Sequence, residues 1–277
     1  MEYVLSVQCP DRPGLVADLS TLLFAANCTI TENGEYVDRD AQIFFMRTAF
    51  EGECDVTALR EAVQALLPEG ARWSVTSPRR MRLAVLATKE PHCLGDLLLR
   101  CAHDELHADI VSVTANHPDL RGLVERFDVP FKHVDAAGLE RAAHEAMIHS
   151  ALAEGDWDYL VMAKYMRILT PEFIARYDGR IVNIHHSFLP AFVGAKPYRQ
   201  AHQRGVKIIG ATAHFATSDL DEGPIIAQGV QPVSHAHSVA DLSLAGKDVE
   251  KTVLAKALRL VIEGRVFVYR NRTILFE

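Results

Sequence analysis

Three polar residues, Asn183, His185 and Asp221, have the types and spacing that acyl-transfer chemistry requires. Asn183 and His185 follow an apolar pair, and their two-residue spacing directs both side chains to the same side of an extended strand. Asp221 lies in a polar turn, residues 217–224, that follows a second apolar run. An amide, an imidazole and a carboxylate on two strand ends can stabilise an oxyanion and move a proton.

Each polar residue of this region also has an ordinary structural explanation, because Asn and Asp cap turns and a single histidine often has only a structural role. Ser187 stands in His-His-Ser-Phe rather than Gly-x-Ser-x-Gly, which argues against a nucleophilic serine. The pairs His185–His186 and His235–His237 lack the spacing of a known zinc motif. We therefore expect His235 and His237 in a solvated loop, and His186 on the face opposite to His185.

The elements that must position these residues alternate between strands and helices from residue 81 onward. The pattern predicts strands at 81–87, 110–113 and 159–163, and helices at 94–101, 120–127, 136–153 and 239–263. A small hairpin is predicted at 266–269 and 273–276. This alternation is typical of an α/β, Rossmann-like domain with a mostly parallel sheet and helices on both faces.

The first part of the chain has a different order. Strands are predicted at 3–7, 29–37, 42–50 and 72–76, with helices after the loop 9–14 and at 55–67. This β-α-β-β-α-β order predicts a ferredoxin-like α+β domain with an antiparallel sheet. Residues 77–80 break the pattern with a proline and two arginines, so we place domains at 1–78 and 79–277.

Composition limits the class of function. The chain has 277 residues, 49% apolar residues and a formal net charge of −7, which gives no general attraction to nucleic acid or to an anionic membrane. The five cysteines form no Cys-x-x-Cys pair, which favours reduced thiols in the cytoplasm. No signal peptide or membrane-spanning run is predicted.

Three segments carry a resemblance to a known family. Residues 160–169 (LVMAKYMRIL), 182–190 (VNIHHSFLP) and 219–226 (DLDEGPII) are similar to the signature segments of folate-dependent formyltransferases. The variants HHSFLPAF and GAKPY, at 185–192 and 194–198, resemble the deformylase branch more closely. Residues 11–15 (DRPGL), in their β-α-β-β-α-β frame, resemble an ACT domain, the regulatory domain of that branch.

The resemblance implies a hydrolase that converts 10-formyltetrahydrofolate to tetrahydrofolate and formate. Such an enzyme balances the one-carbon folate pool and supplies formate for purine synthesis. The family's active-site Asn, His and Asp correspond to Asn183, His185 and Asp221. The resemblance requires no metal, prosthetic group or covalent intermediate.

Folate binding is implied for residues 166–169, namely Met166, Arg167, Ile168 and Leu169, together with Asp219. The related transformylase holds the pterin there largely through backbone groups. An ordinary strand-to-helix connection with Arg167 at the surface is the alternative.

The ACT resemblance implies a small amino-acid effector near Asp11 and Gly14, and a homo-oligomer, either a dimer or a tetramer. Backbone amides at a helix start suit a carboxylate, and Asp11 suits an ammonium group. The alternative is that Asp11 caps the helix and Gly14 is a turn residue.

Water rather than an amine is the expected formyl acceptor. The Gly-rich, phosphate-binding loop of the transformylase is replaced by residues 88–95, where Glu90 repels phosphate and Pro91 lacks an amide proton. A formyltransferase to an unidentified amine and an amino-acid-responsive folate-binding protein remain alternatives. Arg199 stands where the deformylase pattern often has His, so its role stays open.

Overall fold

The computed structural model describes residues 2–77, 79–190 and 197–277, with only the backbone of Pro197. Residues 191–196, which belong to the HHSFLPAF and GAKPY segments quoted above, lie outside the described part. The chain forms two compact units, and each is considered by itself. The first comprises residues 1–79, 263–267 and 274–277, and the second comprises residues 80–262 and 268–273.

The first unit is a four-stranded antiparallel sheet with order β2-β3-β1-β4. Its elements are β1 (Glu2–Pro10), α1 (Leu15–Ala25), β2 (Thr29–Asp38), β3 (Ile43–Glu51), α2 (Val56–Leu66) and β4 (Arg72–Thr76). Alternate residues of β1, β3 and β4 pack against the apolar faces of both helices in one core. The helices therefore cover one face of the sheet, as the β-α-β-β-α-β order predicts.

The second unit contains the elements between residues 81 and 262, and the last two strands of the chain are divided between the two units. The first half has β5 (Met81–Ala87), α3 (Pro91–Ala102), β6 (Ala108–Ala115), the 3-10 turn η1 (Pro118–Leu120), α4 (Arg121–Val124), the 3-10 turn η2 (Glu125–Phe127), β7 (Phe131–His133) and α5 (Arg141–Ala153). The second half has β8 (Tyr159–Ala163), α6 (Pro171–Arg176), β9 (Ile181–His185), α7 (Pro197–Arg204), β10 (Ile208–Phe215), β11 (Ile225–Pro232) and α8 (Val239–Ile262). The short strands β12 (Val266–Tyr269) and β13 (Arg272–Leu275) end the chain.

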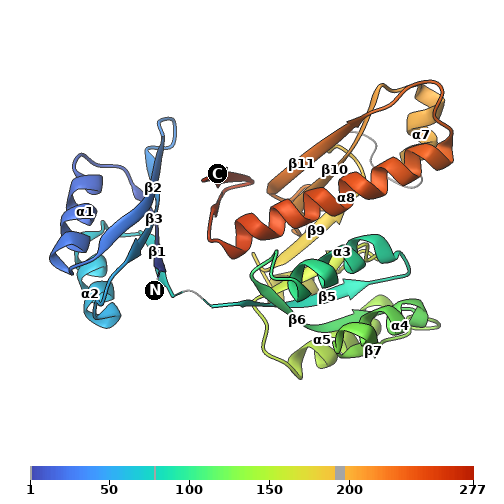
Figure 1. Cartoon of the computed structure of the whole chain (residues 1–277), viewed down its shortest axis with the longest axis horizontal. Helices are drawn as coiled ribbons and strands as arrows, with labels where there is room; N and C mark the ends of the chain where they lie inside the picture. The colour runs from blue at the N-terminus through green and yellow to red at the C-terminus, as the bar shows by residue number, and fades with distance from the viewer. Residues whose placement is uncertain (1, 78, 191–196) are drawn as a thin grey trace. The chain divides into compact units, whose positions relative to one another are not determined.

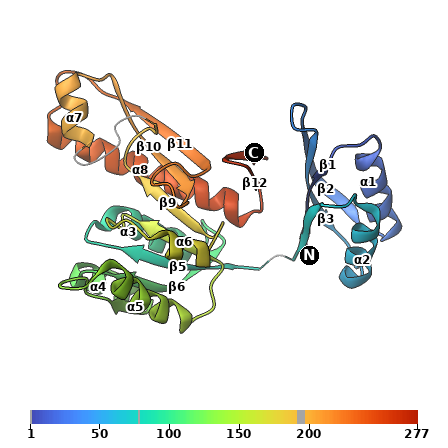
Figure 2. The ribbon, with the colours of Figure 1, turned by 180° about the vertical axis from the view of Figure 1, so that it is seen from behind.

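Seven strands form the sheet of the second unit, in the order β11-β10-β9-β8-β5-β6-β7. Strands β9, β8, β5, β6 and β7 are parallel, whereas β10 and β11 each run antiparallel to their neighbour. Alternate residues of β5 and β8 join α5 and α6 in one core. The long helix α8 crosses β9, β10 and β11 and contacts α3 (Figures 1 and 2). The predicted α/β class with a mostly parallel sheet is confirmed.

Candidate active site

A cavity of about 390 Å³ is lined by residues of β8, β9 and β10 and of the segments that follow these strands. The connection after β8 forms one wall, the end of β9 forms the floor, and the loop after β10 closes another side. The cavity is lined by Met162, Lys164, Tyr165, Met166, Arg167, Ile168, Leu169, Ile174, Asn183, Ile184, His185, His186, His214, Ala216, Thr217, Ser218, Leu220 and Asp221. All three predicted catalytic residues therefore face one cavity.

His185 and Asp221 form a buried, hydrogen-bonded pair. The Nδ1 atom of His185 lies 3.1 Å from Oδ1 of Asp221, and their side chains are 7% and 14% exposed. Burial by itself would raise the pKa of Asp221, but the hydrogen bond from His185 and the neighbouring imidazoles outweigh it and hold the pKa below its ordinary value. Nε2 of His185 is buried without a hydrogen-bond partner among the described residues. The pair thus presents one imidazole nitrogen for a ligand.

The loop after β10 has an unusual backbone that brings Asp221 back toward β9. Asp221 has φ 58°, a left-handed conformation that Asp and Asn tolerate better than most residues. At Gly223 a Cβ atom would lie 1.8 Å from the carbonyl oxygen of Phe215, so only glycine fits. The backbone amide of Phe215 donates to the carbonyl of Pro224 at 3.0 Å and closes the loop.

His214 joins the predicted group, although the sequence pattern did not single it out. On the antiparallel strand β10 it pairs with Asn183 of β9. Its Nδ1 lies 2.9 Å from the carbonyl oxygen of Phe215, and its Nε2 lies 3.2 Å from Nδ2 of Asn183. Burial lowers the pKa of His214, so the neutral ring donates from Nδ1 and accepts at Nε2. His214 therefore fixes which way the Asn183 amide points.

The expectation that His186 points away from His185 is wrong. Strand β9 ends at His185, so the alternation of side chains does not extend to the next residue. The two imidazole rings stack with centroids 4.9 Å apart, and both line the cavity. Burial, the nearby Lys164 ammonium and His185 lower the pKa of His186 to about 4, so its ring is neutral near pH 7.

The predicted folate-binding residues fall into two groups. Met166, Arg167, Ile168 and Leu169 all line the cavity, where Met166 is 57% exposed and Ile168 is 48% exposed. Asp219 is not among the lining residues. Its carbonyl oxygen instead accepts hydrogen bonds from the Thr217 hydroxyl, at 3.1 Å, and from the amide of Glu222, at 3.3 Å.

The other residues considered from the sequence lie elsewhere. Gly14 precedes α1 with φ 88°, and Asp11 has an exposed side chain. Arg199 is exposed on α7, outside the residues that line the cavity. His235 is exposed and Nδ1 of His237 lies 3.0 Å from Oγ of Ser234, in accord with a loop position.

Comparison with known proteins gives agreement over the whole length. Residues 81–258 match the formyl transferase family. The chain is 49% identical to a formyltetrahydrofolate deformylase from Escherichia coli O6:H1 over 98% of this chain and 97% of the relative. A crystal structure of a formyltetrahydrofolate deformylase from Pseudomonas syringae pv. tomato covers 100% of this chain, and 95% of its own chain is matched, with a TM-score of 0.96 and 43% identity. A glycinamide ribonucleotide transformylase from Symbiobacterium toebii covers only 73% of this chain, with 96% of its own chain matched, a TM-score of 0.69 and 32% identity.

Proposed function

The chain belongs to the formyl transferase family, and we propose that Asn183, His185 and Asp221 carry its reaction, the hydrolysis of 10-formyltetrahydrofolate to tetrahydrofolate and formate. The observation that carries this proposal is the buried His185–Asp221 pair. Nε2 of His185 has no hydrogen-bond partner among the described residues, and His185 lines the same cavity as Asn183. Nearly the whole chain is similar to deformylases, whereas only about three quarters of it is similar to a transformylase. This difference supports water as the formyl acceptor.

The first step is the attack of water on the formyl carbon. Asp221, held ionised by its neighbours, takes one proton from the water as the carbon–oxygen bond forms. The formyl oxygen then carries negative charge, which an N–H of Asn183 and the Nε2 proton of His185 stabilise. Before the attack, the negative charge of Asp221, 3.1 Å from Nδ1, stabilises positive charge on the imidazole. In this scheme His214 supports Asn183 by fixing its amide.

Collapse of the tetrahedral intermediate completes the reaction. His185 passes the Nε2 proton to N10 of tetrahydrofolate as the bond from carbon to N10 breaks. Formate leaves as an anion after its hydroxyl proton returns to His185, and the proton held by Asp221 goes to solvent. Each role belongs to a group already in place, so no covalent intermediate is needed.

We place the folate ring system against Met166, Arg167, Ile168 and Leu169. Partly exposed apolar side chains on that wall, beside backbone groups that lie outside any helix or strand, suit a flat heterocycle with polar edges. Asp219 contributes through its carbonyl oxygen, which holds the neighbouring loop in shape. The enzyme uses folate as a substrate and carries no prosthetic group.

Residues 1–78 are proposed to form an ACT-like regulatory domain, and residues 79–277 the catalytic domain. Its effector is a small amino acid near Asp11 and Gly14, and the enzyme is a cytoplasmic homo-oligomer. No helix of residues 2–77, 79–190 or 197–277 has the length and apolar character to cross a membrane. Calorimetry with a panel of amino acids tests the effector, and a panel without any binder rejects it.

Formate release is the direct test of the function. Purified chain is supplied with 10-formyltetrahydrofolate and no amine, and formate and tetrahydrofolate are both quantified. Equal amounts of the two products are expected. Tight folate binding without formate would reject the hydrolase in favour of a transferase or a sensor.

A further inference from the structure

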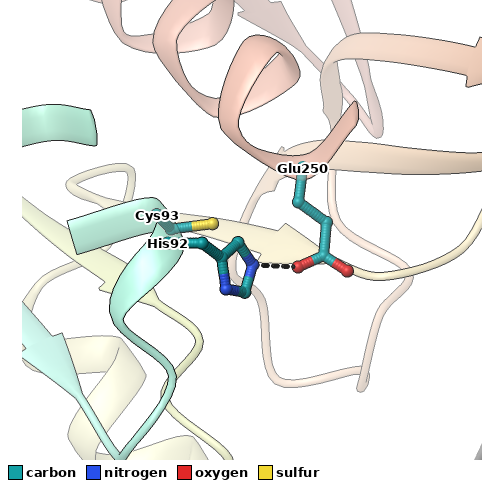
Figure 3. Close-up of side chains that lie close together, drawn as sticks. All are labelled: His92, Cys93 and Glu250. Atoms are coloured by element: carbon teal, nitrogen blue, oxygen red, sulfur yellow. Dashed lines mark hydrogen bonds and ion pairs between the residues drawn. The ribbon is translucent and has the colours of Figure 1, made fainter. Parts of the chain in front are cut away.

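A second cluster of ionisable side chains lies next to the catalytic cavity and centres on Glu250 of α8. Glu250 is 1% exposed, and its carboxylate accepts hydrogen bonds from Tyr198 Oη at 2.6 Å and His92 Nε2 at 2.7 Å. Lys164 Nζ lies 3.2 Å from the same carboxylate. Burial would raise the pKa of Glu250, but these three partners outweigh it and lower the pKa to about 2. Figure 3 shows the His92 ring, at the start of α3, directed at the carboxylate.

A metal site is the first alternative to consider for this cluster. His92, Cys93 and Glu250 place one ligand atom each within 4.8 Å of one another (Figure 3). However, the Lys164 ammonium already neutralises the carboxylate and would repel a cation. Burial also raises the pKa of Cys93, so its sulfur stays a protonated thiol, which is a poor ligand. The cluster is therefore a closed network of hydrogen bonds and one ion pair.

The network reaches the catalytic cavity through two residues. Lys164 lines the cavity and is 8% exposed, while its ammonium is held by Glu250 behind it. His186 also lines the cavity, stacked on His185, and its ring centroid lies 6.5 Å from that of Tyr198. The cavity that contains the His185 imidazole is thus also lined by a buried lysine, Lys164.

The backbone indicates that a lysine at this position has a cost. Lys164 follows β8 with φ 60°, a left-handed conformation that is unfavourable for a residue with a side chain but not for glycine. The facing helix is also adapted, because a Cβ atom at Gly246 would lie 2.0 Å from Tyr198 Oη. Such local strain is found where a side chain has a task that stability alone does not explain.

We propose that Lys164, held in place by Glu250, makes this site hydrolytic by excluding amines as formyl acceptors, an inference that rests on the proposed function. An amine arrives mainly as an ammonium ion and must lose a proton before it attacks. A carboxylate beside the cavity that lacks a cationic partner would attract that ion, and Asp221 could take its proton as it does from water. Here the ammonium of Lys164 occupies the carboxylate of Glu250 and repels a second cation, whereas water is uncharged and enters freely.

The two competing reactions differ only in the attacking atom. In hydrolysis the water oxygen bonds to the formyl carbon, the bond from carbon to N10 breaks, N10 gains one proton, and formate leaves. In transfer an amine nitrogen bonds to the same carbon, the same bond breaks, and one proton lost by the amine balances the proton gained by N10. The products are then an N-formyl amine and tetrahydrofolate.

The test measures both products in one reaction of the full chain. Purified enzyme receives 10-formyltetrahydrofolate and a concentration series of glycinamide, and formate and N-formylglycinamide are quantified. Lys164→Gly removes the charge and relieves the backbone strain, and Lys164→Met removes the charge at similar volume. Lys164→Arg keeps the charge, and Cys93→Ala changes packing beside Glu250 without changing the ion pair.

The wild type, Lys164→Arg and Cys93→Ala are expected to give formate alone. In Lys164→Gly and Lys164→Met the ratio of N-formylglycinamide to formate should rise with glycinamide by about tenfold or more, because the ammonium group that repels a second cation is gone. The gain should shrink in Lys164→Gly combined with Glu250→Gln, because the unpaired carboxylate that attracts an ammonium ion is then missing.

Three outcomes overturn the inference. If Lys164→Gly and Lys164→Met release formate but form no N-formylglycinamide at any glycinamide concentration, that result would show that Lys164 does not control the acceptor. Folded variants that form neither product would show that Lys164 acts in the chemistry itself. N-formylglycinamide from Lys164→Arg at the level of Lys164→Gly would rule out the charge. A wild type that releases no formate would instead reject the proposed hydrolysis, so the two failures are distinguishable.

Discussion

Replacement of Asp221 by Asn should reduce turnover severely while leaving the fold intact. Asn has nearly the same volume and can still accept the hydrogen bond from Nδ1 of His185, which lies 3.1 Å from Oδ1 of Asp221. It also tolerates the left-handed backbone at this position, where φ is 58°. What the substitution removes is the negative charge and the ability to take a proton from water.

The size of the effect follows from the geometry. For two unit charges 3.1 Å apart, an effective dielectric of about 20 gives an attraction of roughly 5 kcal/mol. That attraction stabilises positive charge on the imidazole before the water attacks. Hydration of the separated charges makes the net stabilisation smaller than this attraction. Loss of proton transfer by itself costs about 10²–10⁴ in rate. We therefore expect kcat to fall by about 10³ or more.

Steady-state formate release is the assay, with thermal unfolding as the check on folding. Glu222→Gln is the matched control, because it makes the same change in charge at the next residue, which is exposed and is not among the residues lining the cavity. The control should keep the wild-type kcat. A folded Asp221→Asn enzyme with more than about a tenth of the wild-type kcat would refute the proton-transfer role.

Three further predictions follow from contacts in the two units. His214→Phe should lower kcat by about tenfold or more with little change in KM, because Asn183 loses the contact that aims its amide, and it should be non-additive with Asn183→Ala in a double-mutant cycle. His186 has a pKa of about 4 in the folded chain against 6.5 in the unfolded chain, so the unfolded chain binds more protons between these values. The neutral His186 ring therefore contributes its full share of the free energy of unfolding above pH 6.5, and roughly 3 kcal/mol is lost as the pH falls toward 4. Measured by denaturant unfolding, the free energy of unfolding should fall less between pH 6.5 and 4 in His186→Asn than in the wild type, whereas the control His235→Asn should behave like the wild type. Asp55→Ala should lower the free energy of unfolding of the first unit by about 1 kcal/mol, measured by urea denaturation, because the side chain caps two backbone amides of α2.

The sequence predicted best those elements that have both a clear apolar pattern and sharp ends. Strands β4, β5 and β8 occupy the predicted ranges residue for residue. The elements that were not predicted are short or lie at an edge: β7 has three residues, α6 has six, α7 has eight, and β11 is a half-exposed edge strand. None of these buries a regular apolar face, so periodicity carries no signal for them. Helix α5 begins at Arg141 rather than at 136, because Gly138 takes a left-handed φ of 71° just before it.

The candidate site was predictable as a set of residues but not as an arrangement. Asn183, His185 and Asp221 were selected by type and spacing, and the structure brings them to one cavity, while their catalytic roles remain to be tested. His214 was missed because it lies within an apolar run, where its neighbours indicate only a buried strand. Its contact with Asn183 depends on which residues of β9 and β10 are paired, and a single strand's sequence does not contain that information.

The reversal of β10 explains why the arrangement depends on the whole sheet. Because β10 runs antiparallel to β9, its last residue, Phe215, pairs with Val182 near the start of β9 rather than with its end. The loop that follows must turn back along the sheet before Asp221 can reach His185, which is why it contains a left-handed Asp221 and a glycine without room for a Cβ. A shift of one residue in the β9–β10 register would turn the His214 side chain to the opposite face from Asn183. The pairing of β9 with β10 thus determines the positions of the Asn183 amide and of the His185–Asp221 pair. A substitution that weakens this pairing should therefore impair catalysis before it unfolds the unit.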